Sequence, residues 1–360
     1  MKRKLLLLGF AMVLALASCT RKDAAEGSGH SIVIPEDDDI RGVFVLNEGN
    51  FTYANSSLSY YDIEADTVAN NLFFKVNDAP IGDVGQSLAR IGNSLYIVVN
   101  NSKFIYKVDA TTIEYQAILE GFSSPRFMLD IGHGKAYVSD LAAAGFWVVN
   151  TDNFTIKKFV ATGKSTECMV RVGDEVFVSN WSKAYVAADN NTIQVIDCEN
   201  DSLVKEIVVA TEPNAMVVDK HNHIWVSCSG GFEGTQDPSI ICVDAASHEV
   251  IRRFDLAAGS YPSGMAIDGA GENVFFMNGG MSALNVYKMS VDATELPDTP
   301  FITSNSRLFY GLKVNPQNGD IYITDAKNYV SNGDLLRYSV AGTLIATASL
   351  GIIPSYMLFN

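Results

Sequence analysis

The sequence predicts an all-β fold after residue 41, and three observations support this prediction. Short runs of alternating apolar and polar residues, rich in Val, Ile, Tyr and Phe, recur between Gly, Asn, Asp and Pro. No long window shows the 3.6-residue apolar period of a helix. One pattern of strands also repeats along the chain. With 360 residues, of which 48% are hydrophobic, the protein is large enough to bury an extensive core.

An aromatic residue inside a strand, followed by a polar or small residue where the strand ends, marks each repeat. The pairs are Phe44/Asn47, Tyr96/Asn100, Tyr137/Asp140, Phe177/Asn180, Trp225/Cys228, Phe275/Asn278 and Tyr322/Asp325. Their mean interval is roughly 46 residues, within the range of about 40 to 50 typical of a propeller blade. Since one small sheet cannot cover both of its faces, the copies should stack and close into a ring.

Two further elements keep the same phase as the aromatic marker. An inner strand introduced by Pro-x-x-Met or a relative of it precedes most markers, in residues 125–128, 166–169, 213–216 and 262–265. A strand ending in Asp and an outer strand follow the marker. We therefore expect four strands in every repeat.

The ends of the repeat region predict how the ring closes. The first repeat begins at its second strand, residues 43–47, and residues 354–359 have the inner-strand pattern with no repeat after them. Pairing of these two segments would leave no open sheet edge. The predicted fold is a seven-bladed β-propeller over residues 41–360, closed by the C-terminal strand.

The N-terminal segment predicts a processed and lipidated protein. Lys2, Arg3 and Lys4 precede an apolar run over residues 5–18, which suits a signal peptide and is too short to span a bilayer. The run ends in Leu16-Ala17-Ser18-Cys19, which resembles the bacterial lipobox. We expect a signal peptide over residues 1–18, a lipid on Cys19 and a flexible tether over residues 19–40. Ordinary cleavage beside a chance cysteine is the alternative.

Charge and cysteine content exclude some partners. The net charge of -15 argues against nucleic acid as a partner and against membrane contact other than through the lipid anchor. We expect Cys168, Cys198, Cys228 and Cys242 to be free or partly paired, and Cys228 and Cys242 lie on adjacent strands that a disulfide could join.

The candidate site lies at one face of the ring. Inner strands begin and second strands end at the same face, so their loops should converge there. The candidate ligand-binding residues are Asn47, Asn50, Phe51, Gln86, Asn100, Lys103, Arg126, Asp140, Asn180, Trp181, Tyr185, Asn214, Phe232, Tyr310, Lys327 and Tyr356. Aromatic planes and amides suit a large, flat ligand with polar edges, or a glycan.

Structural roles compete with ligand binding at several of these positions. Asn47, Asn100 and Asn180 end strands, where an amide often caps a turn. Arg126 could pair with a carboxylate of a neighbouring blade. The inserts at residues 181–191 and 230–238 exceed what a hairpin needs, which favours recognition.

The sequence contains no recognisable catalytic or cofactor motif. Nucleophile elbows, His-Glu-x-x-His helices, phosphate-binding glycine loops and paired-cysteine zinc spacings are all missing. His221 and His223 have no evident third metal ligand. We expect a non-catalytic protein without a metal or cofactor.

The repeat phrases at residues 136–140, 176–180 and 192–197 resemble the YVTN or YncE-like seven-bladed propeller repeat. The opening at residues 42–50, the segments at 56–62 and 82–87, and the lipobox resemble surface-layer or YncE-family lipoproteins of Bacteroidota. Within that group, BtuG-type members bind cobalamin and sit over a TonB-dependent transporter. The resemblance implies a surface-exposed outer-membrane lipoprotein that captures a corrinoid or similar nutrient for such a transporter. A propeller enzyme such as a lactonase and an adhesin for glycan or protein are the alternatives.

Overall fold

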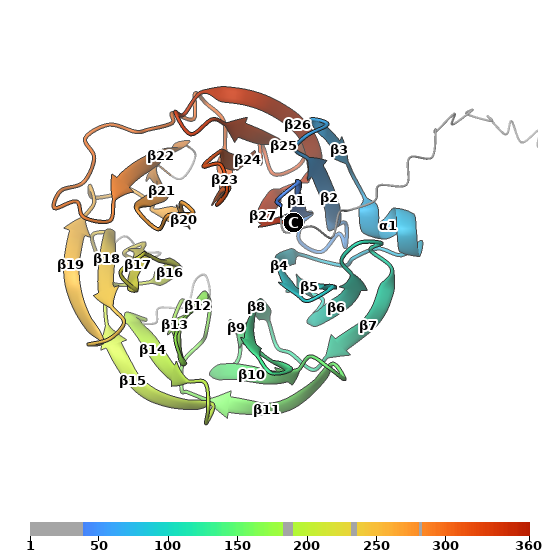
Figure 1. Cartoon of the computed structure of the whole chain (residues 1–360), viewed down its shortest axis with the longest axis horizontal. Coiled ribbons are helices and arrows are strands. Elements are labelled where there is room, and N and C mark those ends of the chain that lie inside the picture. Colours follow the sequence, from blue (N-terminus) through green and yellow to red (C-terminus); the bar gives the residue numbers. More distant parts are fainter. Residues whose placement is uncertain (1–38, 183–189, 232–235, 281–282) are drawn as a thin grey trace, which may run out of the picture. The chain divides into compact units, whose positions relative to one another are not determined.

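The computed structural model describes residues 39–182, 190–231, 236–280 and 283–360. In this part of the chain, seven antiparallel sheets follow one another around a common axis (Figure 1). One helix accompanies them, α1 (Leu72–Asn77), which follows the short outer strand of the first blade. The predicted all-β, seven-bladed propeller is confirmed.

The strands form concentric layers around the axis. Within each layer the strands are named in order from blade 1 to blade 7. The innermost strands are β27 (Pro354–Phe359), β4 (Gly85–Ile91), β8 (Pro125–Gly132), β12 (Met169–Val172), β16 (Pro213–Val218), β20 (Ser263–Ile267) and β23 (Phe309–Val314). The second strands are β1 (Gly42–Asn47), β5 (Ser94–Val99), β9 (Lys135–Asp140), β13 (Glu175–Ser179), β17 (His223–Cys228), β21 (Asn273–Gly280) and β24 (Ile321–Asp325).

The outer half of each blade completes the sheet. The third strands are β2 (Ser57–Asp62), β6 (Phe104–Asp109), β10 (Gly145–Asn150), β14 (Thr192–Asp197), β18 (Ser239–Asp244), β22 (Ala283–Ser290) and β25 (Asn332–Tyr338). The fourth strands, in blades 1 to 5 and 7, are β3 (Thr67–Ala69), β7 (Tyr115–Glu120), β11 (Thr155–Ala161), β15 (Ser202–Val208), β19 (Glu249–Asp255) and β26 (Leu344–Ile352).

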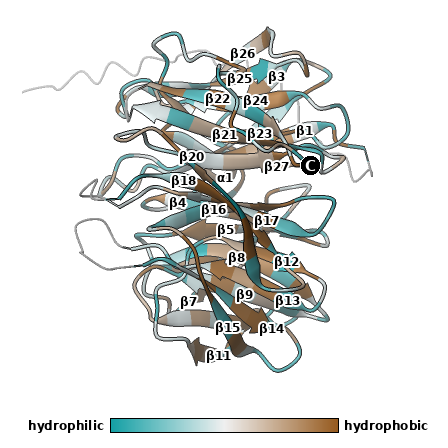
Figure 2. Ribbon diagram, turned by 90° about the vertical axis from the view of Figure 1, so that its left-hand side faces the viewer, coloured by the Kyte–Doolittle hydropathy of each residue, from teal (hydrophilic) through white to brown (hydrophobic). Residues whose placement is uncertain are grey.

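The aromatic residue of each second strand is part of the core between blades. Tyr96 of blade 2 packs in one apolar cluster with Met128 and Val138 of blade 3, and Trp225 of blade 5 packs with Phe276 of blade 6. Burying one large apolar side chain contributes about 1.5–3 kcal/mol. Apolar residues follow the strands, and polar residues are frequent in the connecting loops (Figure 2). The repeated aromatic residue therefore stabilises the stacking of neighbouring sheets.

The C-terminal strand closes the ring as predicted. β27 pairs with β1 in antiparallel register, with Phe44 opposite Leu358 and Leu46 opposite Tyr356. The backbone N–H of Asn360 donates to Gly42 O at 3.0 Å and extends the pairing. Blade 1 is thus built from both ends of the described chain.

Blade 6 departs from the expected four strands. Its described residues form three strands, and the outer position holds one isolated bridge between Val286 and Ile302. The segment that leads to Ile302 contains Pro297 and Pro300, which have no N–H to donate to a sheet. The prediction of four strands was wrong for this blade because of these prolines.

Two further findings concern the thiols and the membrane. Cys168, Cys198, Cys228 and Cys242 are all free, so the possible disulfide between Cys228 and Cys242 does not form. Within the described residues, no helix is sufficiently long and apolar to span a bilayer.

Candidate functional site

The inner strands begin at one face of the propeller, which we call the upper face, and a β-bulge turns their first side chains toward the axis. In β8 the register shifts between Pro125 and Met128, and the same irregularity occurs at the start of β16, β20, β23 and β4. Bulges re-aim side chains in this way. Seven residues are equivalent to Arg126 in the inner-strand motif of residues 125–128, counting Arg126 itself. They form what we call the mouth ring: Gln86, Arg126, Glu167, Asn214, Ser263, Tyr310 and Ser355.

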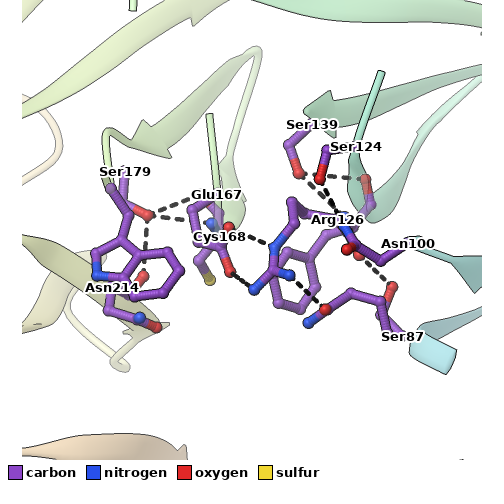
Figure 3. A network of polar contacts seen from close by, with 12 residues as sticks. Ser87, Asn100, Ser124, Arg126, Ser139, Glu167, Cys168, Ser179 and Asn214 are labelled. Atoms are coloured by element: carbon purple, nitrogen blue, oxygen red, sulfur yellow. Dashed lines mark hydrogen bonds and ion pairs between the residues drawn. The ribbon is translucent and has the colours of Figure 1, made fainter. Parts of the chain in front are cut away.

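Arg126 lies at the centre of the polar contacts in the mouth ring. Its Nε and Nη2 donate to the two carboxylate oxygens of Glu167, both at 2.7 Å, and its Nη1 donates to Gln86 (Figure 3). Burial by itself would lower the pKa of Arg126, but the carboxylates of Glu167 and Glu48 raise it, so the guanidinium stays charged. A bidentate pair of this kind fixes the plane of the guanidinium.

The ring of Trp181 lies against this fixed guanidinium. The Arg126 Cζ is 5.8 Å from the Trp181 ring centroid, which is within the range of a cation–π contact. Arg126 therefore connects three blades and holds an indole ring beside the mouth of the channel. The sequence left open whether Arg126 pairs with a carboxylate of a neighbouring blade or binds a ligand. In the structure, its charge is paired with Glu167 of blade 4.

A second carboxylate at the mouth, Glu48, is hydrogen-bonded to residues of blades 7 and 1. The Tyr310 hydroxyl donates to Glu48 Oε2 at 3.2 Å. Burial raises the pKa of Glu48 to about 7, against the opposing effect of Arg126 and of hydrogen bonds from Ser355 and Tyr310. Glu48 is consequently a weaker acid than an ordinary glutamate.

A cavity of about 350 Å³ lies along the axis and is lined by the inner strands of six blades. Phe127, Tyr310 and Tyr356 contribute aromatic rings, and the centroids of Phe127 and Tyr356 are 6.0 Å apart. Asn214 and Lys313 contribute polar groups. We call this space the channel cavity.

Serine hydroxyls hold the inner strands of adjacent blades together. Ser87 Oγ of blade 2 donates to the Arg126 carbonyl oxygen at 2.6 Å, and Ser179 Oγ of blade 4 donates to the Asn214 carbonyl oxygen at 2.9 Å (Figure 3). These bonds cross blade boundaries directly beneath the mouth ring. The site is therefore built on strands whose spacing is fixed, which lowers the entropy lost when a ligand binds.

Exposed aromatic side chains surround the mouth on the side of blades 1 and 7. Phe51 and Tyr53 are 67% and 75% exposed, and Tyr329 is 41% exposed. Asn50 Nδ2 donates to the Tyr329 carbonyl oxygen at 2.6 Å and so joins the two loops. Tyr329 in turn contacts Tyr310, with ring centroids 5.8 Å apart. Tyr329 therefore links this exposed loop to Tyr310 of the mouth ring.

The structure brings many of the predicted site residues together and separates others from them. Gln86, Arg126, Trp181, Asn214, Tyr310 and Tyr356 lie in the mouth ring, beside it or in the channel cavity. Asn50, Phe51, Lys103 and Lys327 lie in partly or fully exposed loops. Lys327 Nζ is paired with Asp334 at 2.8 Å. Tyr185, Phe232 and Cys19 lie outside the described residues.

Three predicted site residues are fully buried and are not accessible to a ligand. Asn47 donates to Ser57 and Ser59 of the neighbouring strand β2, and Asn180 donates to the Ser165 carbonyl oxygen and to Gln194. Asp140 accepts from backbone N–H groups and from Trp147 Nε1 at 3.1 Å. Asn100 likewise donates to Ser124 and to the Pro125 carbonyl oxygen. In the structure the polar groups of these four residues satisfy turns and strands of the fold, which is the structural role that competed with ligand binding at Asn47, Asn100 and Asn180.

The sequence reasoning missed Glu48, Glu167, Cys168 and Lys313. Glu167 occupies the same position in its repeat as Arg126 and Asn214 occupy in theirs, so the repeat alignment itself carried the signal. Glu48 is one residue past a strand end, and nothing in its local sequence shows that it is desolvated. Among the described residues, no group of three or more His, Cys, Asp and Glu side chains is placed to hold a metal ion.

The fold and its polar channel mouth define a seven-bladed β-propeller with a candidate binding site on its upper face. Residues 41–360 match the model of the family described as a domain of unknown function (DUF5074), and the chain belongs to this family. Among curated proteins, none matches the chain at a significant level.

Solved structures with the same fold have low sequence identity to this chain. A quinonprotein alcohol dehydrogenase-like protein from Bacteroides thetaiotaomicron is 15% identical, with a TM-score of 0.68 over 89% of this chain and 78% of that chain. A candidate 6-phosphogluconolactonase from Bacteroides fragilis is 12% identical, with a TM-score of 0.66 over 91% and 100% of the two chains. Hydrazine synthase from Kuenenia stuttgartiensis is 16% identical, with a TM-score of 0.64 over 76% and 88%. These similarities show the shared fold alone.

Proposed function

We propose that this protein is a surface-anchored binding lipoprotein that captures a corrinoid, or a nutrient of similar shape, on its upper face for a TonB-dependent transporter of the outer membrane. The anchor and the location rest on the lipobox that ends at Cys19, and the ligand class and transporter rest on the resemblance to BtuG-type proteins. The observation that carries the proposal is the aromatic and amide surface around a channel mouth whose arginine is already paired with a glutamate.

Because the arginine at the mouth is already paired, the site favours a ligand without strong charge over a strongly charged one. Arg126 is neutralised by Glu167, and burial raises the pKa of Glu48 to about 7. What a ligand meets at the mouth is therefore the Trp181 ring, the Gln86 and Asn214 amides and the aromatic rim. A corrin ring offers a flat apolar face and amide-bearing edges, which match ring stacking and amide hydrogen bonds.

The size of the cavity indicates where such a ligand would lie. A volume of about 350 Å³ is at the small end of the range for ligand pockets, about 300–1,000 Å³. A corrinoid is too large to enter it. In this proposal the ligand rests across the upper face and contacts Trp181 and the rim around Phe51 and Tyr329.

The proposal is tested by titrating the purified protein with cyanocobalamin in a calorimeter. We expect binding at micromolar concentrations or tighter, and we expect Trp181→Ala to weaken it by tenfold or more, since buried aromatic contacts dominate binding energies. Arg126→Lys should also weaken it, because lysine keeps the charge beside Glu167 and loses the flat fork that supports the indole.

A matched control distinguishes a site effect from a folding effect. Arg171 lies on the opposite face, where its Nη1 donates to the Ile131 carbonyl oxygen at 2.7 Å, so Arg171→Lys makes the same chemical change away from the mouth. This variant should bind cyanocobalamin as the wild type does. Absence of heat at micromolar protein and ligand would end the corrinoid proposal, and equal affinity of all variants would show that the wrong loops were chosen.

A second candidate function is an acid–base enzyme such as a lactonase, which the pKa of Glu48 favours. A carboxylate that titrates near pH 7 beside a tyrosine hydroxyl is suited to general acid–base catalysis. Proton release from a sugar lactone, measured at constant pH and lost in Glu48→Gln, would favour this function over capture without chemistry.

A further inference from the structure

Seven residues of the inner strands lie directly opposite the aromatic markers of the second strands. They are Leu358, Ala89, Leu129, Val170, Val217, Ala266 and Lys313, each paired with the marker of its own blade. Six of these seven equivalent residues are Ala, Val or Leu. Lys313, opposite Tyr322 in blade 7, is the exception, so the repeat does not explain its charge.

Lys313 has no charged or hydrogen-bonding partner among the described residues. It is half-buried, and the contact that the structure gives its ammonium is with the face of Tyr356, where Nζ lies 5.3 Å from the ring centroid. Partial burial of an ammonium group without a counterion is unfavourable, and a cation–π contact offsets only part of that loss. An apolar side chain, as in the other six blades, would avoid this unfavourable burial of charge.

The channel cavity offers Lys313 no counterion of its own. Of the described residues that line this cavity, Lys313 is the one with a charged side chain. Glu167, at the mouth, accepts hydrogen bonds from Nε and Nη2 of Arg126. Glu48 accepts from Tyr310, and the cation that acts on it most strongly is Arg126. In a chain with a net charge of -15, the cavity is therefore a local positive site.

We propose that the channel cavity binds a small carboxylate, with its charge against Lys313 Nζ and its apolar body among Phe127, Tyr356 and the aliphatic residues of the inner strands. The cavity shares Asn214, Tyr310 and Ser355 with the mouth ring, but Lys313 lies outside that ring, and the carboxylate is a different ligand from the one proposed for the upper face. A single carboxylate matches a single ammonium, whereas phosphate would bring more charge and more acceptor atoms than these walls satisfy.

The remaining walls support a ligand with an apolar body. Met128, Met169, Met216, Met265 and Met357 line the cavity at equivalent positions, together with Val170 and Leu312. Methionine side chains adapt their shape and make favourable contacts with aromatic rings. The thiol of Cys168 also lines the cavity, and burial raises its pKa to about 11, so it adds no negative charge at neutral pH.

The test compares benzoate with benzamide, its neutral isostere, by calorimetry on the purified protein. We expect the wild type to bind benzoate at least tenfold more tightly than benzamide, because charge-assisted hydrogen bonds are about twice as strong as neutral ones. Lys313→Met, which restores the apolar residue type of the other blades, should abolish that preference. Lys313→Arg should retain it.

Lys288 provides the matched control. Its Nζ lies 5.5 Å from the ring centroids of both Phe275 and Phe301, so Lys288→Met also removes an ammonium from an aromatic face, but outside the cavity. This variant should keep the preference for benzoate. Equal binding of benzoate and benzamide by the wild type, no binding of either up to about 10 mM, or tighter binding of inorganic phosphate would each overturn the proposal.

The result of the benzoate test can be distinguished from the result of the cyanocobalamin test. Lys313→Met leaves the mouth ring and the rim intact, so it should bind cyanocobalamin as the wild type does. Loss of the benzoate preference with cyanocobalamin affinity unchanged supports a separate carboxylate site. Failure of the wild type to bind cyanocobalamin leaves the benzoate comparison unaffected.

Discussion

At the scale of single residues, the two glutamates of the channel mouth differ through their partners. Glu167 accepts two hydrogen bonds from a guanidinium, whereas the hydrogen bonds to Glu48 come from the neutral hydroxyls of Tyr310 and Ser355. Desolvation is the main influence on Glu48 and raises its pKa to about 7. Glu48 should therefore make the stability of the protein depend on pH.

We predict that stability falls between about pH 5 and pH 7 because of Glu48. A carboxyl whose pKa is higher in the folded state binds more protons when folded, so its ionisation in the unfolded chain favours unfolding as pH rises. A rise from 4.5 to about 7 corresponds to at most about 3 kcal/mol. Glu48→Gln should remove this loss, so that the variant gains stability relative to the wild type between pH 5 and pH 8.

Urea unfolding of both proteins at pH 5 and pH 8 measures the effect. Glu64→Gln is the control, since Glu64 is an exposed carboxylate near the same blade. The same change in unfolding free energy between pH 5 and pH 8 for wild type and Glu48→Gln would contradict the prediction and would mean that Glu48 is solvated.

The sequence could predict part of the site at this scale. Arg126, Asn214 and Tyr310 were found because the repeat places them where inner strands begin. The pairing of Arg126 with Glu167 could not be read from the sequence, because the two residues are 41 positions apart and belong to different blades. The burial that perturbs Glu48 depends likewise on the assembled ring.

At the scale of elements, the inner strands approach one another closely beside the closure. A Cβ placed on Gly311 of β23 would lie 2.2 Å from the Ser355 carbonyl oxygen of β27 and 2.9 Å from Thr324 Oγ1. Backbone atoms of a paired strand cannot move aside as a flexible side chain can. Glycine at this position allows the innermost strands of blades 7 and 1 to lie next to each other.

We predict that Gly311→Ala lowers the free energy of unfolding by about 1–3 kcal/mol, the usual range for overpacking a buried position. Urea unfolding measures it, with Gly280→Ala as control, since a Cβ on Gly280 would meet no atom within 4 Å. Equal stability of the two variants would show that β23 and β27 can separate without loss.

Element boundaries show where a repeat-based prediction fails. The seven aromatic markers all lie in second strands, because the same burial between sheets is required in every blade. The outer strand faces fewer constraints, and in blade 6 Pro297 and Pro300 replace a regular strand. Because prolines avoid sheet interiors, these two residues argued against a fourth strand here, but the regular spacing of the repeats favoured one.

At the scale of the whole molecule, closure makes blade 1 depend on residues more than 300 positions apart. Val43 and Val45 are fully buried and share an apolar cluster with Met357 and Tyr322. The sequence could predict this closure because the first repeat lacks an inner strand and the last segment supplies one. The same pairing covers the edges that an open ring would expose.

We therefore predict that deletion of residues 354–360 abolishes cooperative unfolding of the propeller. The deletion leaves β1 without its inner neighbour and exposes the apolar residues of blade 1. Calorimetric scanning should show a lower and broader transition, and size-exclusion chromatography should show association through the open edge. A synthetic peptide of residues 354–360 should restore the wild-type transition by strand addition, whereas a peptide of the same composition in scrambled order should not. A truncated chain that unfolds at the wild-type temperature would mean that the other six blades hold the ring without its closing strand.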